Sequence, residues 1–108
     1  MRKIEIQMNQ AIRSKKDWKN DNTSVHFDPE TGVAIVRLFG NKIAVVTNNN
    51  DLTIFDGGNR SVTTKFRLNA IINEFCNAFT DGVFQSNSKW YIRDNNNVIP
   101  FISGYVFS

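Results

Sequence analysis

Apolar residues recur at helical spacing at the beginning of the chain. Residues 3–16 therefore predict an amphipathic helix, because one face of such a helix collects most of the apolar side chains and the opposite face is basic and polar. The residues of the predicted apolar face are Ile4, Met8, Ala11 and Ile12. A break follows at residues 16–22, where Trp18 is expected to fold back onto the domain.

A second stretch of helical periodicity predicts another helix in the second half of the chain. Its N-cap candidates are Ser61, Thr63 and Thr64, and Asp81-Gly82 is its expected end, since glycine suits a left-handed cap residue. The predicted apolar face consists of Leu68, Ile71, Ile72, Phe75, Cys76 and Phe79.

Between and after these helices, short apolar or alternating runs are separated by turns rich in Asn, Asp, Gly and Pro, a pattern typical of antiparallel strands. The predicted strands are residues 23–28, 33–39, 43–47, 52–55, 83–85, 89–94 and 98–106. Pro100 cannot donate to a ladder, so the last strand is expected at an edge or at a bulge. The order α-ββββ-α-ββ(β) predicts a single α+β domain over residues 1–108, an antiparallel β-meander sheet with two packed helices.

Composition limits the class of protein but does not identify it. The 108 residues carry 13 Lys and Arg against 10 Asp and Glu, a net charge of +3 with a pI near 9.2, so the protein is small and mildly basic. No apolar stretch approaches the roughly 20 residues of a membrane helix, and no membrane association is expected. The sequence opens without the apolar core of a secretory signal and carries one cysteine, which favours a reducing cytoplasm. Of the 15 asparagines, the triplets at Asn48–Asn50 and Asn95–Asn97 fall in predicted turns.

The inventory of catalytic side chains is poor. Cys76 lies on the predicted apolar helix edge and His26 is expected to face solvent from a strand, so a Cys–His dyad is not favoured. The sequence lacks the usual ligand set of a zinc site. The carboxylates considered lie in or beside predicted turns, where Asp side chains commonly form hydrogen bonds with the backbone. We therefore expect no enzyme, no catalytic residue, no metal and no cofactor.

Nucleic-acid binding has some support, because single-strand binders combine cations with aromatic side chains on strands. Tyr91 shares one strand face with Lys89 and Arg93, and a second strand places Arg37 and Lys42 close to Phe39. An ordinary solvent-exposed face is the competing interpretation of the Tyr91 stripe.

Three segments, Asn22–Val25, Val36–Ala44 and Thr63–Ile71, resemble small accessory proteins encoded by tailed bacteriophages. The resemblance covers roughly residues 18–92. It implies a viral origin and action in the host cytoplasm, but it supplies no activity and no functional residue.

The favoured hypothesis is a non-enzymatic accessory protein that binds a host protein as an inhibitor or adaptor. Its alternatives are a single-stranded nucleic-acid-binding protein and a structural subunit that forms a homo-oligomer through its C-terminal edge strand. The candidate partner-binding residues are those left over once the predicted core is filled. They are Arg13, Lys16, Phe66, Arg67, Tyr91 and Arg93.

Overall fold

Residues 1–107, which the computed structural model describes, form two helices and nine strands in two antiparallel sheets. The helices are α1 (Lys3–Ser14) and α2 (Val62–Phe75). The large sheet has, in spatial order, β1 (Trp18–Asn20), β2 (Thr23–Asp28), β3 (Val33–Leu38), β4 (Asn41–Val46), β5 (Leu52–Ile54) and β9 (Tyr105–Val106). The small sheet has β6 (Gly82–Ser86), β7 (Lys89–Asp94) and β8 (Asn97–Pro100). The predicted α+β class with antiparallel strands is confirmed.

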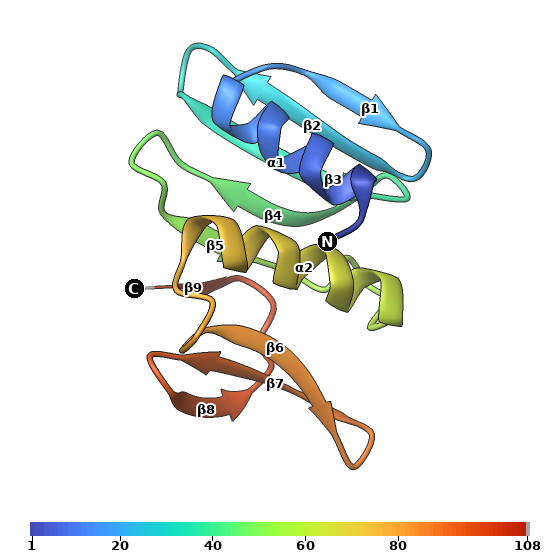
Figure 1. Ribbon diagram of the computed structural model, residues 1–108, viewed down its shortest axis with the longest axis vertical. Coiled ribbons are helices and arrows are strands. Elements are labelled where there is room, and N and C mark those ends of the chain that lie inside the picture. Colours follow the sequence, from blue (N-terminus) through green and yellow to red (C-terminus); the bar gives the residue numbers. More distant parts are fainter. Residues whose placement is uncertain (108) are drawn as a thin grey trace.

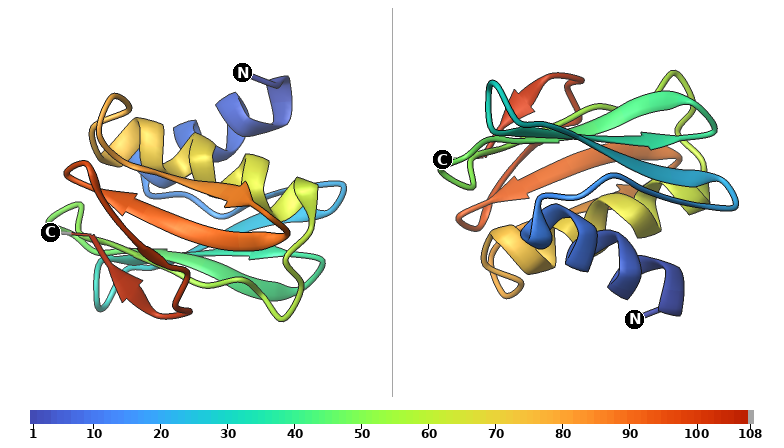
Figure 2. Two further views of the ribbon diagram at one scale, coloured as in Figure 1. Left: turned by 90° about the horizontal axis from the view of Figure 1, so that it is seen from below. Right: turned by 90° about the horizontal axis from the view of Figure 1, so that it is seen from above.

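Both helices cover the same face of the large sheet, and its other face stays free (Figure 1). Viewed from below and from above, the small sheet stands beside α2 and reaches from the helix layer toward the large sheet (Figure 2). Its strand β6 contacts α2, and α2 in turn contacts β4 and β5. One core therefore runs between the helices and both sheets.

The core contains most of the side chains that the helical and alternating patterns predicted to be buried. Met8, Ala11 and Ile12 of α1 are buried, and Trp18 packs against the core, as expected from the sequence. The break predicted at residues 16–22 is wrong in part, because Trp18–Asn20 form strand β1 beside β2. The largest fully buried apolar side chains are Met8, Val36, Ile43, Leu52, Ile54, Leu68, Ile71, Ile72 and Ile92.

The start of α2 is predicted correctly and its end is not. Ser61 is the N-cap, and its Oγ accepts a hydrogen bond from the Thr64 N–H at 3.1 Å. The helix ends at Phe75, because the following backbone turns away and the Asn77 N–H donates to the Asp81 carboxylate at 2.9 Å. Phe79, expected on the apolar face, is consequently 89% exposed in the loop.

The predicted strand over residues 98–106 is two strands in two sheets. Strand β8 pairs with β7 and forms an edge of the small sheet. Pro100 has no N–H, but at this edge position the β7–β8 pairing does not need one. Gly104 then adopts a φ of +90°, and β9 joins the large sheet beside β5. A left-handed residue at this point lets the chain reverse between the sheets.

Three hairpins turn through two residues that both have positive φ, the signature of a type I′ turn. Asn87-Ser88 and Asn95-Asn96 connect the small-sheet strands, and asparagine tolerates this conformation well. The β3–β4 hairpin instead uses Phe39-Gly40, with φ of +51° at Phe39. A bulky residue at positive φ is uncommon, and this one is 68% exposed, so core packing does not compensate for the strain.

Replacing Phe39 by asparagine should therefore stabilise the protein. Relief of the left-handed strain predicts a gain of about 1 kcal/mol in the free energy of unfolding, measured by urea denaturation. The reverse change, Asn87→Phe in the β6–β7 turn, should destabilise by a similar amount. A less stable Phe39→Asn variant would mean that the exposed ring makes contacts that outweigh its strain.

Candidate functional site

Arg67 is not a surface residue, and the expectation that it contacts a partner is corrected. Its side chain is 6% exposed and lies between both helices and the large sheet. The guanidinium donates to Glu5 Oε2 of α1 at 3.1 Å and to Thr23 Oγ1 of β2 at 3.0 Å. The helical periodicity placed this residue among the polar positions, but the carboxylate of Glu5 lets the charge lie inside the protein.

Arg13 is exposed at the C-terminal part of α1, where it joins the two helices. Its Nε forms an ion pair with the Glu74 carboxylate, and Nη2 donates to the Glu74 backbone carbonyl at 3.0 Å. The guanidinium also lies 4.8 Å from the centre of the Phe75 ring. These contacts occupy most of the polar atoms that a partner would use.

Phe66 and Lys16 remain exposed but lie at opposite ends of α1. Phe66 is 42% exposed and lies under the guanidinium of Arg2, 4.3 Å from it, beside the start of α1. Lys16 follows the end of the same helix and lines a shallow hollow with Trp18. These predicted residues therefore do not form one contact surface.

Tyr91 and Arg93 do share a surface, the outer face of the small sheet, which we call the Tyr91 face. Residues directly opposite one another in an antiparallel pair point to the same side. In this register Phe84 and Pro100 both lie opposite Tyr91, and Val98 lies opposite Arg93. The members of the Tyr91 face are Phe84, Lys89, Tyr91, Arg93, Val98 and Pro100.

The Tyr91 face is aromatic and open. The rings of Phe84 and Tyr91 are stacked, with centres 5.5 Å apart and an angle of 21° between their planes. Phe84 is 37% and Val98 52% exposed, and Pro100 is exposed as well. No helix or loop lies in front of this sheet when the molecule is seen from below (Figure 2).

The loop beneath Arg93 is held by the carboxyl group of Asp81, which accepts hydrogen bonds from the Asn77 and Asn95 N–H groups. Burial raises the pKa of Asp81, but the N–H groups of Asn95 and Asn77, the Thr80 hydroxyl and the Arg93 charge outweigh this effect. The pKa of Asp81 therefore lies below its usual value. This ionised carboxylate ties the end of α2 to the β7–β8 turn.

The cysteine and histidine do not form a dyad. Cys76 lies at the end of α2, where burial, followed by the charges of Asp81 and Asp94, raises its pKa to about 11. His26 lies on the outer face of β2, 58% exposed, with Nδ1 3.4 Å from Asp17 Oδ1. The thiol lies on the helix side of the sheet, away from His26, and its raised pKa makes it a poor nucleophile.

A cavity of about 410 Å³, lined partly by Asp81 and Asp94, lies between the end of α2 and the β7–β8 turn. Asp94 accepts a hydrogen bond from the Tyr105 hydroxyl at 2.7 Å. This hydrogen bond, together with burial and the negative charge of Asp94, raises the pKa of Tyr105 to about 12. Two of the three carboxylates that line the cavity, those of Asp81 and Asp94, therefore support the backbone or a neighbouring side chain.

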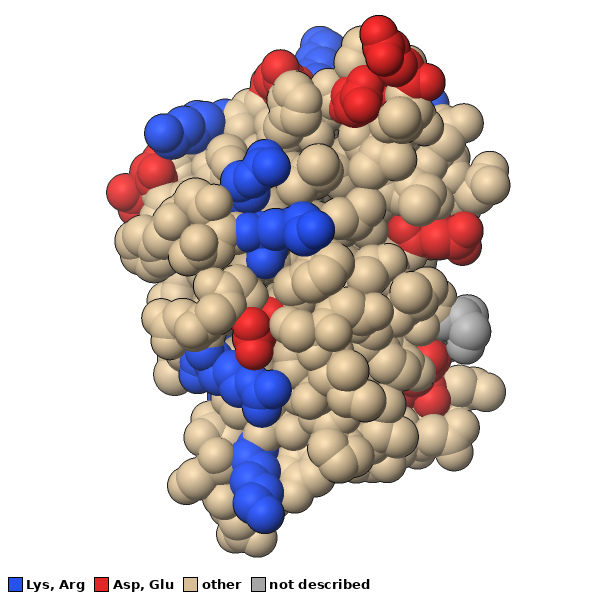
Figure 3. Space-filling view, turned by 180° about the vertical axis from the view of Figure 1, so that it is seen from behind, with Lys and Arg blue, Asp and Glu red and all other residues tan. Residues whose placement is uncertain are grey.

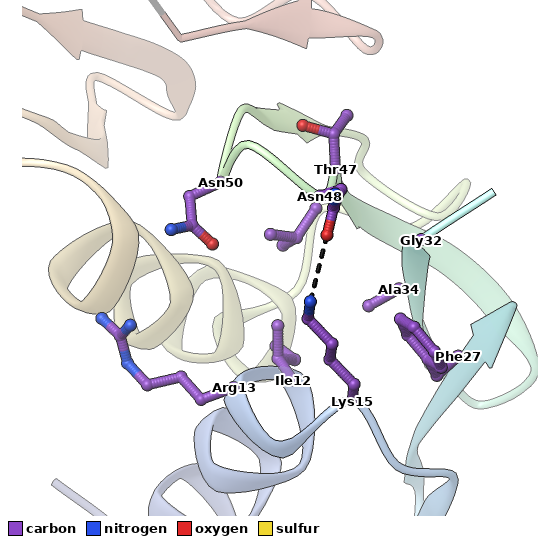
Figure 4. A pocket seen from close by; sticks show the side chains of 10 residues that line it. Ile12, Arg13, Lys15, Phe27, Gly32, Ala34, Thr47, Asn48 and Asn50 are labelled. Atoms are coloured by element: carbon purple, nitrogen blue, oxygen red, sulfur yellow. Dashed lines mark hydrogen bonds between the residues drawn. The ribbon is translucent and has the colours of Figure 1, made fainter. Parts of the chain in front are cut away.

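A second cavity of about 220 Å³ lies between the end of α1 and the turn after β4 (Figure 4). Lys15 points across it, and its Nζ donates to Asn48 Oδ1 at 3.1 Å. Ile12, Phe27 and Ala34 supply its apolar wall. Its cations, Lys15 and Arg13, already have partners within the protein, so this pocket does not offer a free charge.

Two further classes of feature, a metal cluster and a membrane-spanning helix, are absent from the part of the chain that the structure describes. Among residues 1–107, no three His, Cys, Asp or Glu side chains gather closely enough to hold a metal ion. Within the same range, no helix has the length and apolar character needed to cross a membrane.

The model of the Kyanoviridae Gp96 protein family matches residues 1–108. The chain belongs to this family. Its members are phage proteins, so the resemblance to phage proteins is confirmed at this level, without an activity attached to it. No curated protein and no solved structure matches the chain significantly.

Phe84 was not singled out from the sequence, although a local signal exists. The two-residue turn Asn87-Ser88 fixes the register of the hairpin, so that Phe84 lies opposite Tyr91. The position of this turn in the sequence is therefore enough to predict that Phe84 and Tyr91 form a pair.

The buried Arg67–Glu5 pair generates a stability prediction. Arg67→Met should lower the free energy of unfolding by about 3–5 kcal/mol, because it leaves the Glu5 charge buried without a partner. The double variant Glu5→Leu/Arg67→Met should recover a large part of this loss, since no isolated charge remains. Urea denaturation measures both, and a loss below about 1 kcal/mol in the single variant would contradict this account.

The lowered pKa of Asp81 predicts that the free energy of unfolding depends on pH. Because its pKa is lowered by folding, its contribution to stability is present above the unfolded pKa and is lost as pH falls through the folded pKa. Asp81→Asn should therefore cost about 1–3 kcal/mol at pH 7, and the difference from the wild type should shrink toward pH 3. Denaturation at both pH values tests this, and a constant difference would show that charge is not involved.

Proposed function

We propose that this phage protein is a non-enzymatic accessory protein that binds a host protein through the Tyr91 face, as an inhibitor or adaptor. The observation that carries the proposal is the stacked Phe84–Tyr91 pair on an uncovered sheet face. Stacking holds the two rings in place before binding, so less side-chain entropy is lost when a partner covers them.

The composition of the Tyr91 face matches the anatomy of a protein interface. Tyr, Phe and Arg are enriched in such interfaces, and aromatic anchors surrounded by smaller apolar contacts carry most of the binding energy. Tyr91 lies on the middle strand β7 between Phe84 of β6 and Pro100 of β8, and Arg93 and Lys89 lie farther along β7. The cations would lie at the rim, where they orient an acidic partner more than they add affinity.

Self-assembly through the C-terminal edge is the weaker alternative. The free edge of β8 is four residues long and ends at Pro100, which has no N–H to offer a further strand. The other C-terminal strand, β9, contains two residues. Light scattering distinguishes this alternative by a mass several times 12.4 kDa.

The test is capture of a partner from a lysate of the phage's host. Wild-type protein should retain a discrete host protein, and the Phe84→Ser/Tyr91→Ser variant should bind that isolated protein at least about 30-fold more weakly, as expected for a lost aromatic anchor.

Phe39→Ser provides the matched control, since it removes an exposed ring from the large sheet and should leave the affinity unchanged. Equal retention by the wild type and the Phe84→Ser/Tyr91→Ser variant would contradict binding through the Tyr91 face.

A further inference from the structure

The large sheet has a second uncovered surface, and its outer face carries a row of cations. Lys19, Arg37 and Lys42 lie on this face because the register of β1 to β4 aligns Lys19 with Ser24, Ser24 with Arg37, and Arg37 with Lys42. Figure 3 views the molecule from this side, where blue side chains follow one another down the surface, with one red group between the upper and the lower ones and the other red side chains toward the margins. Lys19 and Lys42 are three strand spacings apart, about 14 Å.

These three cations are available to a ligand. Among the described residues, no carboxylate lies within ion-pair distance of any of them, whereas the exposed Arg60 nearby is paired with Asp56 at 3.2 Å. Lys42 Nζ lies 4.4 Å from the centre of the Phe55 ring, which orients its side chain without neutralising it. The row therefore presents uncompensated positive charge.

An exposed aromatic ring lies beside this row. Phe39, at the tip of the β3–β4 hairpin, borders a hollow of about 260 Å³ that Lys19, Asp21 and Ser24 also line, so one carboxylate lies at the rim of the site. The fold gains little from a phenylalanine here, since the ring is exposed and its backbone lies in the left-handed region. A ring kept at a strained, exposed position is suited to a ligand contact.

We propose that this surface binds single-stranded nucleic acid. Lys19, Arg37 and Lys42 contact backbone phosphates, and a base enters the hollow and stacks on Phe39. A flexible polyanion with exposed base faces fits both features, whereas a duplex keeps its bases stacked inside and offers no free face to the ring. The site is separate from the Tyr91 face and does not depend on the proposed protein partner.

The proposal predicts a measurable salt dependence. Each neutralised phosphate of a single strand contributes about −0.7 to the slope of log K against log salt, so three contacts give a slope of about −2. Arg37→Gln/Lys42→Gln should reduce the slope to about −0.7. Phe39→Ala should weaken binding about five- to 150-fold and leave the slope nearly unchanged, because stacking is not ionic.

The experiment measures fluorescence anisotropy with a labelled twelve-nucleotide oligothymidylate, at several salt concentrations, for the full chain. Two controls match the test variants. Lys3→Gln/Lys16→Gln removes two exposed cations at the ends of α1, and Phe84→Ala removes a ring from the Tyr91 face. Both control variants should bind the oligonucleotide as the wild type does, and circular dichroism checks that every variant is folded.

A polyglutamate of equal charge serves as a second ligand, which shows whether the surface prefers a nucleic acid or any acidic polymer, such as an acidic protein segment. Oligothymidylate should bind more tightly than polyglutamate, and Phe39→Ala should remove that preference. The proposal is overturned if the two polyanions bind equally tightly, if the Lys3→Gln/Lys16→Gln control reduces the slope as much as Arg37→Gln/Lys42→Gln does, or if oligothymidylate does not bind at low salt. Since Phe84 lies on the other sheet, these outcomes are independent of host-protein capture.

Discussion

The arrangement of this protein depends on one buried ion pair. Arg67 of α2 reaches Glu5 of α1 and Thr23 of β2, and both charged side chains are at most 7% exposed. Glu5 uses its second oxygen to accept the Arg2 N–H at 3.1 Å, so the same carboxylate also caps α1. A buried charge is costly without its partner, and any packing that separates these elements would leave one. The pair therefore selects one arrangement of two helices and a sheet among those that would bury similar apolar area.

From this pair onward, the two helices run parallel along a polar seam. One turn after Glu5, Asn9 Nδ2 donates to the Ala70 carbonyl at 3.1 Å, and one turn later Arg13 pairs with Glu74. The seam fixes the rotation of α2, which in turn positions the small sheet. Asn69 holds β6 by donating to the Val83 carbonyl at 2.9 Å and accepting the Val83 N–H at 2.8 Å. Each sheet consequently packs one face on the helix layer and leaves its other face uncovered.

Local signals made much of this fold predictable from the sequence. Periodicity located both helices, Ser61 marked the start of α2, and asparagine-rich turns separated the strands. The pairs that determine the arrangement are not local: Arg67 and Glu5 are 62 residues apart in the chain. A pattern-based assignment treats Arg67 and Asn69 as solvent-exposed polar positions, because it cannot see the groups that satisfy them. The same limit applies to the end of α2, where the Asp81 side chain replaces the expected glycine cap.

The candidate surfaces follow the same division between local and distant information. Alternation along β7 correctly placed Tyr91 and Arg93 on one face, but the contribution of β6 and β8 needed the register. The sequence places Arg37 and Lys42 near Phe39, but two further facts come only from the structure. Strand β1 aligns Lys19 with these cations, and Phe39 has a left-handed backbone conformation. The two uncovered faces differ in chemistry: one groups stacked rings with apolar residues, and the other aligns cations that have no ion-pair partner within residues 1–107 beside a strained ring. Because each face belongs to a different sheet, a substitution on one can change its binding without disturbing the other. The two proposed contact surfaces therefore share a single core.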